Sequence, residues 1–221
     1  MLIQCYCIHV DVKSPPVRTR RAERAEATRR RIVAAATKLF AELGYSATTI
    51  EAIAVEADVA VETVYSRFRN KARLLDAVLG PAIVCDDDPR SLSERPEMAA
   101  IRAISDQMAQ VQAMAHLSRT ILERAAQVHL ILETAAACDE KAAELHRADR
   151  RHRREGQAAY IDMLMTNGPL RQGLTAEDAA DTYASLANPS TYRLLTVDRA
   201  WTPSHYEHWL ADSLCRLLLP G

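Results

Sequence analysis

The sequence is poor in glycine, in phenylalanine and in long apolar runs, with six glycines and two phenylalanines among 221 residues. No apolar run approaches the ~18 residues that a membrane-spanning helix needs, so we expect no contact with a membrane. The five cysteines are scattered and odd in number, and Cys5-x-Cys7 lacks the spacing of a redox or zinc pair. Because a signal-peptide pattern is also missing, we expect a cytoplasmic protein with free thiols.

Motifs that carry catalysis are missing as well. The glycines form neither a dinucleotide-binding G-x-G-x-x-G nor a P-loop, and neither G-x-S-x-G nor H-E-x-x-H occurs. Four histidines of the second half do not have the spacing of zinc ligands: His116, His129, His146 and His152. We therefore predict no catalytic residue, no metal and no cofactor.

The composition predicts an all-α protein. Hydrophobic residues make up 48% and charged residues 26% of the chain, as in soluble globular proteins. Alanine, leucine, arginine and glutamate are strong helix formers. No long stretch alternates apolar and polar residues with β-branched enrichment, which would indicate strands.

The net charge of −1 hides an asymmetry. Residues 1–80 carry 13 Lys and Arg against 9 Asp and Glu, whereas residues 81–221 carry 15 against 20. A basic N-terminal part suits a polyanionic partner such as nucleic acid. A solvated charged surface would give the same composition.

Two short helices joined by a tight turn are predicted in the basic part. The first places four apolar residues on one face at spacing i, i+3, i+4, i+7: Ile50, Ile53, Ala54 and Ala57. After Asp58-Val59, a second helix over residues 60–68 repeats this spacing with Val61, Val64, Tyr65 and Phe68. This arrangement is typical of a helix-turn-helix, which places its second helix in the DNA major groove.

Side chains that can bind DNA occupy the outward face of the second helix. Arginine can donate to guanine, glutamate can accept from cytosine, and valine or threonine can contact the thymine methyl. Threonine, tyrosine and lysine can bind phosphates, and either Thr48 or Thr49 can cap the first helix. We predict DNA contacts by Thr49, Val61, Glu62, Thr63, Tyr65, Ser66, Arg67 and Lys71.

A helix with a basic start precedes the motif. Arginines between Arg18 and Arg31 lead into it, and they can lie along a phosphate backbone. Gly44 stands where a helix-ending residue with positive φ is wanted. Lys71, at the first turn of a further helix over residues 71–79, is unfavourable for the helix dipole, and a nearby phosphate would offset this.

Residues from about 25 to 80 resemble the DNA-binding domain of the TetR family of bacterial transcriptional repressors. Aspartate replaces the usual glycine of the turn at position 58, where it tolerates left-handed backbone. Ala60 replaces the usual capping serine, which costs ~1 kcal/mol of capping. The matching residues are Phe40, Gly44-Tyr45, Thr48-Thr49, Ile53-Ala54, Ala57, Val59, Thr63-Val64-Tyr65, Phe68, Lys71 and Leu74-Leu75.

The remainder shows helical periodicity without a comparable motif, which predicts a larger helical bundle. The densely charged first half of its longest helix should be exposed, whereas Ala158, Ile161 and Leu164 in the second half should be buried. Helices are expected over residues 98–112, 118–138, 139–167, 175–186, 188–198 and 203–219. The chain thus divides into an N-terminal extension (1–20), a helix-turn-helix domain (21–80, motif 49–68) and a C-terminal domain (81–221).

The resemblance implies that the C-terminal domain binds a small-molecule effector and forms a homodimer through helices around 175–198 and 203–219. Dimerisation also suits DNA reading, because two recognition helices ~34 Å apart can read a palindrome. Effector-pocket candidates, which can equally be ordinary core or surface residues, are Met108, Met114, His129, Tyr160 and Met163.

The favoured function is a dimeric, sequence-specific repressor that a small-molecule effector releases from a palindromic operator in double-stranded DNA. Three alternatives remain open: a DNA-binding regulator without an effector, a helical adaptor, and an enzyme that uses the C-terminal bundle.

Overall fold

The computed structural model describes residues 20–84 and 95–221, so the predicted N-terminal extension lies, up to residue 19, outside the described residues. The described residues contain helices and no strands, which confirms the predicted all-α fold. The helices are α1 (Arg20–Ala47), α2 (Ile50–Glu56), α3 (Val61–Phe68), α4 (Lys71–Val84), α5 (Pro96–Arg102), α6 (Gln107–Ala136), α7 (Glu140–Met165), α8 (Ala176–Leu186), α9 (Pro189–Arg193), the π-helix η2 (Leu194–Asp198) and α10 (Pro203–Leu218).

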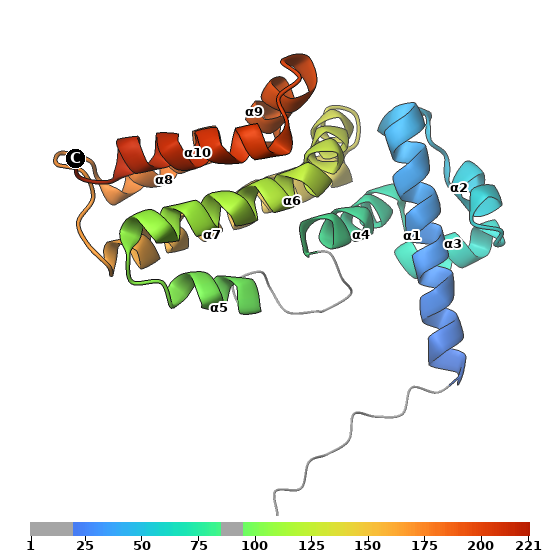
Figure 1. Ribbon diagram of the computed structural model, residues 1–221. Helices are drawn as coiled ribbons and strands as arrows, with labels where there is room; N and C mark the ends of the chain where they lie inside the picture. The colour runs from blue at the N-terminus through green and yellow to red at the C-terminus, as the bar shows by residue number, and fades with distance from the viewer. Residues whose placement is uncertain (1–19, 85–94) are drawn as a thin grey trace, which may run out of the picture.

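Helices α1 to α4 form the N-terminal unit, in which α1 lies beside α2 and α3 while α4 leads toward the larger bundle (Figure 1). Gly44 interrupts α1 with φ 76 and ψ 171, which confirms the positive φ expected there. A residue with a Cβ would be strained in this conformation. The break allows Tyr45 to turn back and stack on Phe40, with ring centroids 5.6 Å apart.

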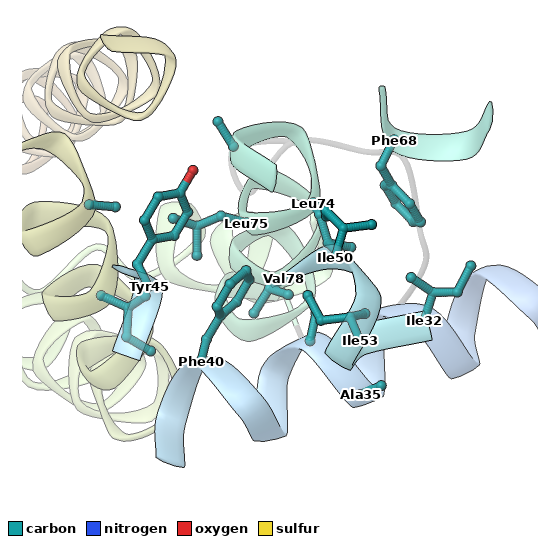
Figure 2. Packing of buried hydrophobic residues seen from close by; sticks show 14 of the residues in the cluster. Ile32, Ala35, Phe40, Tyr45, Ile50, Ile53, Phe68, Leu74, Leu75 and Val78 are labelled. Carbon is teal, nitrogen blue, oxygen red and sulfur yellow. The ribbon is translucent and has the colours of Figure 1, made fainter. Parts of the chain in front are cut away.

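The core of the N-terminal unit is shared with the bundle. Phe40, Leu74 and Leu75 are fully buried at its centre, and Figure 2 shows them packed with residues of α1, α2 and α4. Leu132 of α6 and Ala142 of α7, both fully buried, belong to the same apolar cluster. A displacement of α6 or α7 would therefore change the packing of the core that supports the helix-turn-helix.

A second core fills the bundle, where α6 packs against α7 and α10 and α7 packs against α8. Its largest fully buried side chains include Tyr160 of α7 and Tyr206 of α10. The other buried members come mainly from α6, α8 and α10, together with Met98 and Ile101 of α5.

Three predicted helix boundaries were wrong. The expected helix at 98–112 is broken, because the Asp106 carboxylate accepts a hydrogen bond from the Ala109 N–H (2.7 Å) and starts α6 anew. Helix α6 then continues without interruption across the expected break before residue 118 and ends at Ala136. Helix α4 likewise runs on through Gly80-Pro81 to Val84.

Side-chain caps begin the later helices. Thr175, Asn188 and Thr202 each accept a hydrogen bond from a backbone N–H of the first turn of α8, α9 and α10. Along α7, however, two burial predictions were wrong: Ala158 is exposed, whereas Asp149, in the charged half, is only 7% exposed.

Candidate nucleic-acid interface

Threonine caps the first helix of the helix-turn-helix, and the structure separates the roles of the two candidates. The Thr49 hydroxyl oxygen accepts from the Ala52 N–H (3.1 Å), so Thr49 is the N-cap of α2. Thr48 is fully buried and donates to the Gly44 carbonyl (2.8 Å). Of the pair, only the exposed Thr49 hydroxyl can reach a phosphate.

The turn between α2 and α3 has left-handed backbone at Asp58, with φ 51, as the sequence predicted. Arg31 of α1 holds this turn, since its Nε donates to the Ala57 carbonyl (3.0 Å) and its terminal nitrogen donates to the Asp58 carbonyl. Arg31 therefore has a structural role inside the domain, while its contact with a DNA phosphate stays a prediction.

The outward face of α3 presents a polar surface, while its inward face anchors the helix. Val64 and Phe68 are buried, and Ala60 provides no side-chain cap, as expected. Val61 and Thr63 are half-buried at the edges. The exposed residues of α3 are Glu62, Tyr65, Ser66 and Arg67.

The positive charge of Lys71 at the first turn of α4 is offset by groups of the protein itself, whereas the sequence suggested a DNA phosphate. Its ammonium donates to the carbonyls of Tyr45 (2.8 Å) and Thr48 (3.0 Å). It also lies 4.1 Å from the centroid of the Tyr45 ring, and burial lowers the pKa of this ammonium. These carbonyls supply the negative partner, while a further N–H of the ammonium can still donate to DNA.

A basic cleft lies where α1, the end of α3 and α4 meet. Its volume is about 500 Å³, and its lining includes four arginines: Arg29, Arg67, Arg69 and Arg73. Arg73 pairs with Asp76 (3.6 Å) and Arg29 with Glu26 (3.9 Å). Arg67 and Arg69 make no side-chain hydrogen bond or ion pair among the residues that the structure describes.

The sequence predicted two arginines of this cleft as DNA-binding residues, Arg67 on the outward face of α3 and Arg29 in the basic start of α1. The run from Arg67 to Arg73 contains three arginines and one lysine, which was a visible signal of positive charge. The placement of Arg29 beside these arginines could not be read from the sequence, because it depends on the packing of α1 against α4.

A series of hydrogen bonds connects the helix-turn-helix domain to the bundle. The Tyr45 hydroxyl donates to the Asp139 carboxylate (2.7 Å), and this hydrogen bond lowers the pKa of Asp139. The same carboxylate caps α7 by accepting from the Lys141 N–H (2.9 Å). Tyr45 therefore joins the Lys71 contact at the start of α4 to the first turn of α7.

The structure brings together only part of the predicted effector pocket. Met114 and Tyr160 lie in the second core, with Met163 packed against it. Met108 is 55% exposed. His129 instead lies with its Nδ1 3.3 Å from the Asp149 carboxylate, which also accepts from Arg153 (3.1 Å).

The His129–Asp149 contact lies below the surface. Burial would raise the pKa of Asp149, but the hydrogen bonds from His129 and Arg153 and the positive charge of Arg153 lower it overall. Within residues 20–84 and 95–221, no group of three or more His, Cys, Asp or Glu side chains is arranged to hold a metal ion. None of the helices described there combines the length and apolarity that crossing a membrane requires.

Comparison with known proteins identifies the N-terminal unit. Residues 32–78 match the family model described as bacterial regulatory proteins, tetR family. A comparison with curated proteins found no match. Among solved structures, NalD of Pseudomonas aeruginosa, the secondary repressor of the MexAB-OprM multidrug efflux pump, is 23% identical, with a TM-score of 0.69 over 89% of this chain and 98% of NalD.

Two further structures resemble most of the chain and contain small molecules. A chain from Saccharomonospora viridis, assigned as a transcriptional regulator and bound to choline, is 22% identical with a TM-score of 0.67, over 87% of this chain and 98% of its own. SmeT in complex with triclosan is 20% identical with a TM-score of 0.66, over 87% of this chain and 92% of SmeT. At these identities the likeness establishes the fold of the chain, including the C-terminal bundle.

Proposed function

We propose that this chain, which belongs to the TetR family of bacterial regulatory proteins, is a cytoplasmic dimeric repressor that a small-molecule effector releases from a palindromic DNA operator. The observation that carries the proposal is the exposed polar face of α3, held by the buried Val64 and Phe68. A polar helix face beside a cleft lined by arginines favours a nucleic-acid partner over the enzyme and adaptor alternatives.

The proposed DNA contacts divide by chemistry. Thr49, Tyr65 and Lys71 donate to phosphates, which fixes the position of α3 along the duplex. The base edges in the major groove are contacted by the remaining predicted residues: Val61, Glu62, Thr63, Ser66 and Arg67.

The proposed homodimer forms through residues 175–198 and 203–219. Helix α8 carries three half-buried alanines at a spacing of four, Ala176, Ala180 and Ala184, which allow a second helix to approach closely. Trp201 and Trp209, also half-buried, contact one another near the start of α10, with ring centroids 5.9 Å apart. A twofold axis through this surface presents two copies of α3 to successive major grooves.

The proposed effector binds the C-terminal domain (81–221) and lowers the affinity of the DNA-binding domain (21–80) for its operator. An effector among Met114, Tyr160 and Met163 would shift α7, and the Tyr45–Asp139 hydrogen bond would pass this shift to the start of α4. A coupling free energy of about 1–3 kcal/mol is typical for two such sites and is sufficient.

Sedimentation and DNA binding test the proposed dimer. The DNA is an operator selected from random sequences, compared with its single half-sites. We expect the protein to sediment as a dimer and to bind the full site at least ~100-fold more tightly than a half-site, because both recognition helices act together. Inserting half a helical turn between the half-sites should remove this advantage. Equal affinity for full and half sites would contradict the proposal that two recognition helices of one dimer bind the operator together.

A further inference from the structure

One buried hydroxyl in the second core lacks the partner that such groups normally have. Tyr160 is 1% exposed, and its hydroxyl has no hydrogen-bond partner in the described part of the chain. Burial raises the pKa of this phenol, so the group remains a neutral O–H donor at physiological pH. A buried polar group without a partner destabilises the protein, and most such groups are satisfied.

Neighbouring tyrosines show that the core satisfies hydroxyls elsewhere. Ser118 donates to the Met114 carbonyl (2.7 Å), so the Tyr183 hydroxyl, 2.8 Å from the Ser118 oxygen, is the donor of that second bond. The Tyr206 hydroxyl donates to the Leu186 carbonyl (2.9 Å). Tyr160, whose ring centroid lies 5.1 Å from that of Tyr183, is the exception among these three.

The buried charges of the described residues are already engaged. His129 and Asp149 contact one another. Arg95, the N-cap residue of α5, takes part in another interaction, although its Nε makes no hydrogen bond among the described residues. Gln110 is also satisfied, since its amide nitrogen donates to the Ile101 carbonyl (3.2 Å) and its amide oxygen accepts from Asn167 (3.1 Å). A charged ligand entering this core would meet no spare opposite charge, and burial of an unpaired charge is costly.

We propose that the Tyr160 hydroxyl is the hydrogen-bonding anchor for the effector, and that the effector is an uncharged, mainly apolar molecule with a carbonyl or ether oxygen. This inference rests on the proposed function and specifies the chemical class that its effector site takes. The Tyr160 O–H donates to the ligand oxygen, while Met114 and the rings of Tyr160 and Tyr183 contact the apolar part.

The first test needs no ligand. Replacing Tyr160 by phenylalanine removes the unpaired hydroxyl and should raise the melting temperature of the full-length protein by about 2–4 °C. Tyr206→Phe is the matched control, because it removes a hydroxyl that donates to the Leu186 carbonyl and should lower the melting temperature. A melting temperature for Tyr160→Phe that falls as in the control would overturn the proposal, since the hydroxyl would then have a structural partner such as water.

The second test compares probes of similar shape and different charge. The uncharged set is 2-naphthamide, 2-acetonaphthone and 2-methoxynaphthalene, and the charged probes are 2-naphthoate and choline. We expect at least one uncharged probe to stabilise the wild-type protein and release it from a selected operator, with about tenfold weaker binding to Tyr160→Phe. Stronger stabilisation by 2-naphthoate or choline, no stabilisation by any uncharged probe, or equal binding to both proteins would overturn the proposal.

Failure of this inference is distinguishable from failure of the proposed function. The wild-type protein should bind a selected operator when no probe is present, because this binding depends on α3 and not on the second core. A wild-type protein that binds no DNA selectively would contradict the function itself, whatever the melting temperatures are.

Discussion

Reversing the charge of Arg67 and Arg69 together (R67E/R69E) should lower the affinity for operator DNA at least ~1000-fold, because each proposed dimer would carry four anions beside the DNA in place of four cations. The protein should still fold, since both side chains are exposed and make no side-chain bond within the described residues. Fluorescence anisotropy with labelled operator at ~0.1 M salt, where charges within ~10 Å still interact, measures this loss.

A matched control reverses two arginines of the bundle. Arg150 and Arg154 are exposed on α7, and R150E/R154E changes the net charge of the protein by the same amount. Its affinity should fall by less than ~5-fold, because charges far beyond the Debye length are screened. Equal losses in both double variants would mean that total charge, rather than the end of α3, governs binding.

Replacing Phe40 by alanine should lower the free energy of unfolding by about 3–5 kcal/mol, as expected for a large cavity in a packed core. Phe40 is fully buried and stacks on Tyr45, among the side chains of Figure 2. Its cluster also includes Leu132 of α6, so the loss should appear in the unfolding of the whole chain. Urea unfolding followed by circular dichroism measures it.

Leu43→Ala is the control for this substitution on the same helix. Leu43 is 53% exposed, and its truncation should change the free energy of unfolding by no more than about 0.5 kcal/mol. A Phe40→Ala protein as stable as Leu43→Ala would show that the shared core is not packed as described.

Local signals in the sequence were sufficient for the helices of the N-terminal unit. Gly44 and Asp58 adopt the expected positive φ, Thr49 caps α2, and the inward face of α3 is the predicted one. Of the four apolar residues predicted for one face of α3, Val64 and Phe68 are buried, whereas Tyr65 is 47% exposed. The confirmed features depend on residues a few positions apart, which is the range over which helical periodicity and capping act.

Contacts between distant residues could not be predicted in the same way. The Lys71 ammonium binds the carbonyls of Tyr45 and Thr48, and Arg31 binds the turn at Asp58. Their charges alone suggested phosphate contacts, because a phosphate and a carbonyl oxygen attract the same donors. Periodicity also failed at Asp106, where a single capping carboxylate divides a continuous apolar pattern into two helices.

The central claim is that α3 reads DNA sequence. The most direct measurement selects binding sites for the full-length protein from random duplex DNA and then titrates the binding of the selected and random sequences against salt. The account predicts an enriched palindrome, preferred over random DNA by at least ~1000-fold, with an affinity that falls steeply as salt rises. No enriched sequence, together with equal affinities for all duplexes, would contradict it.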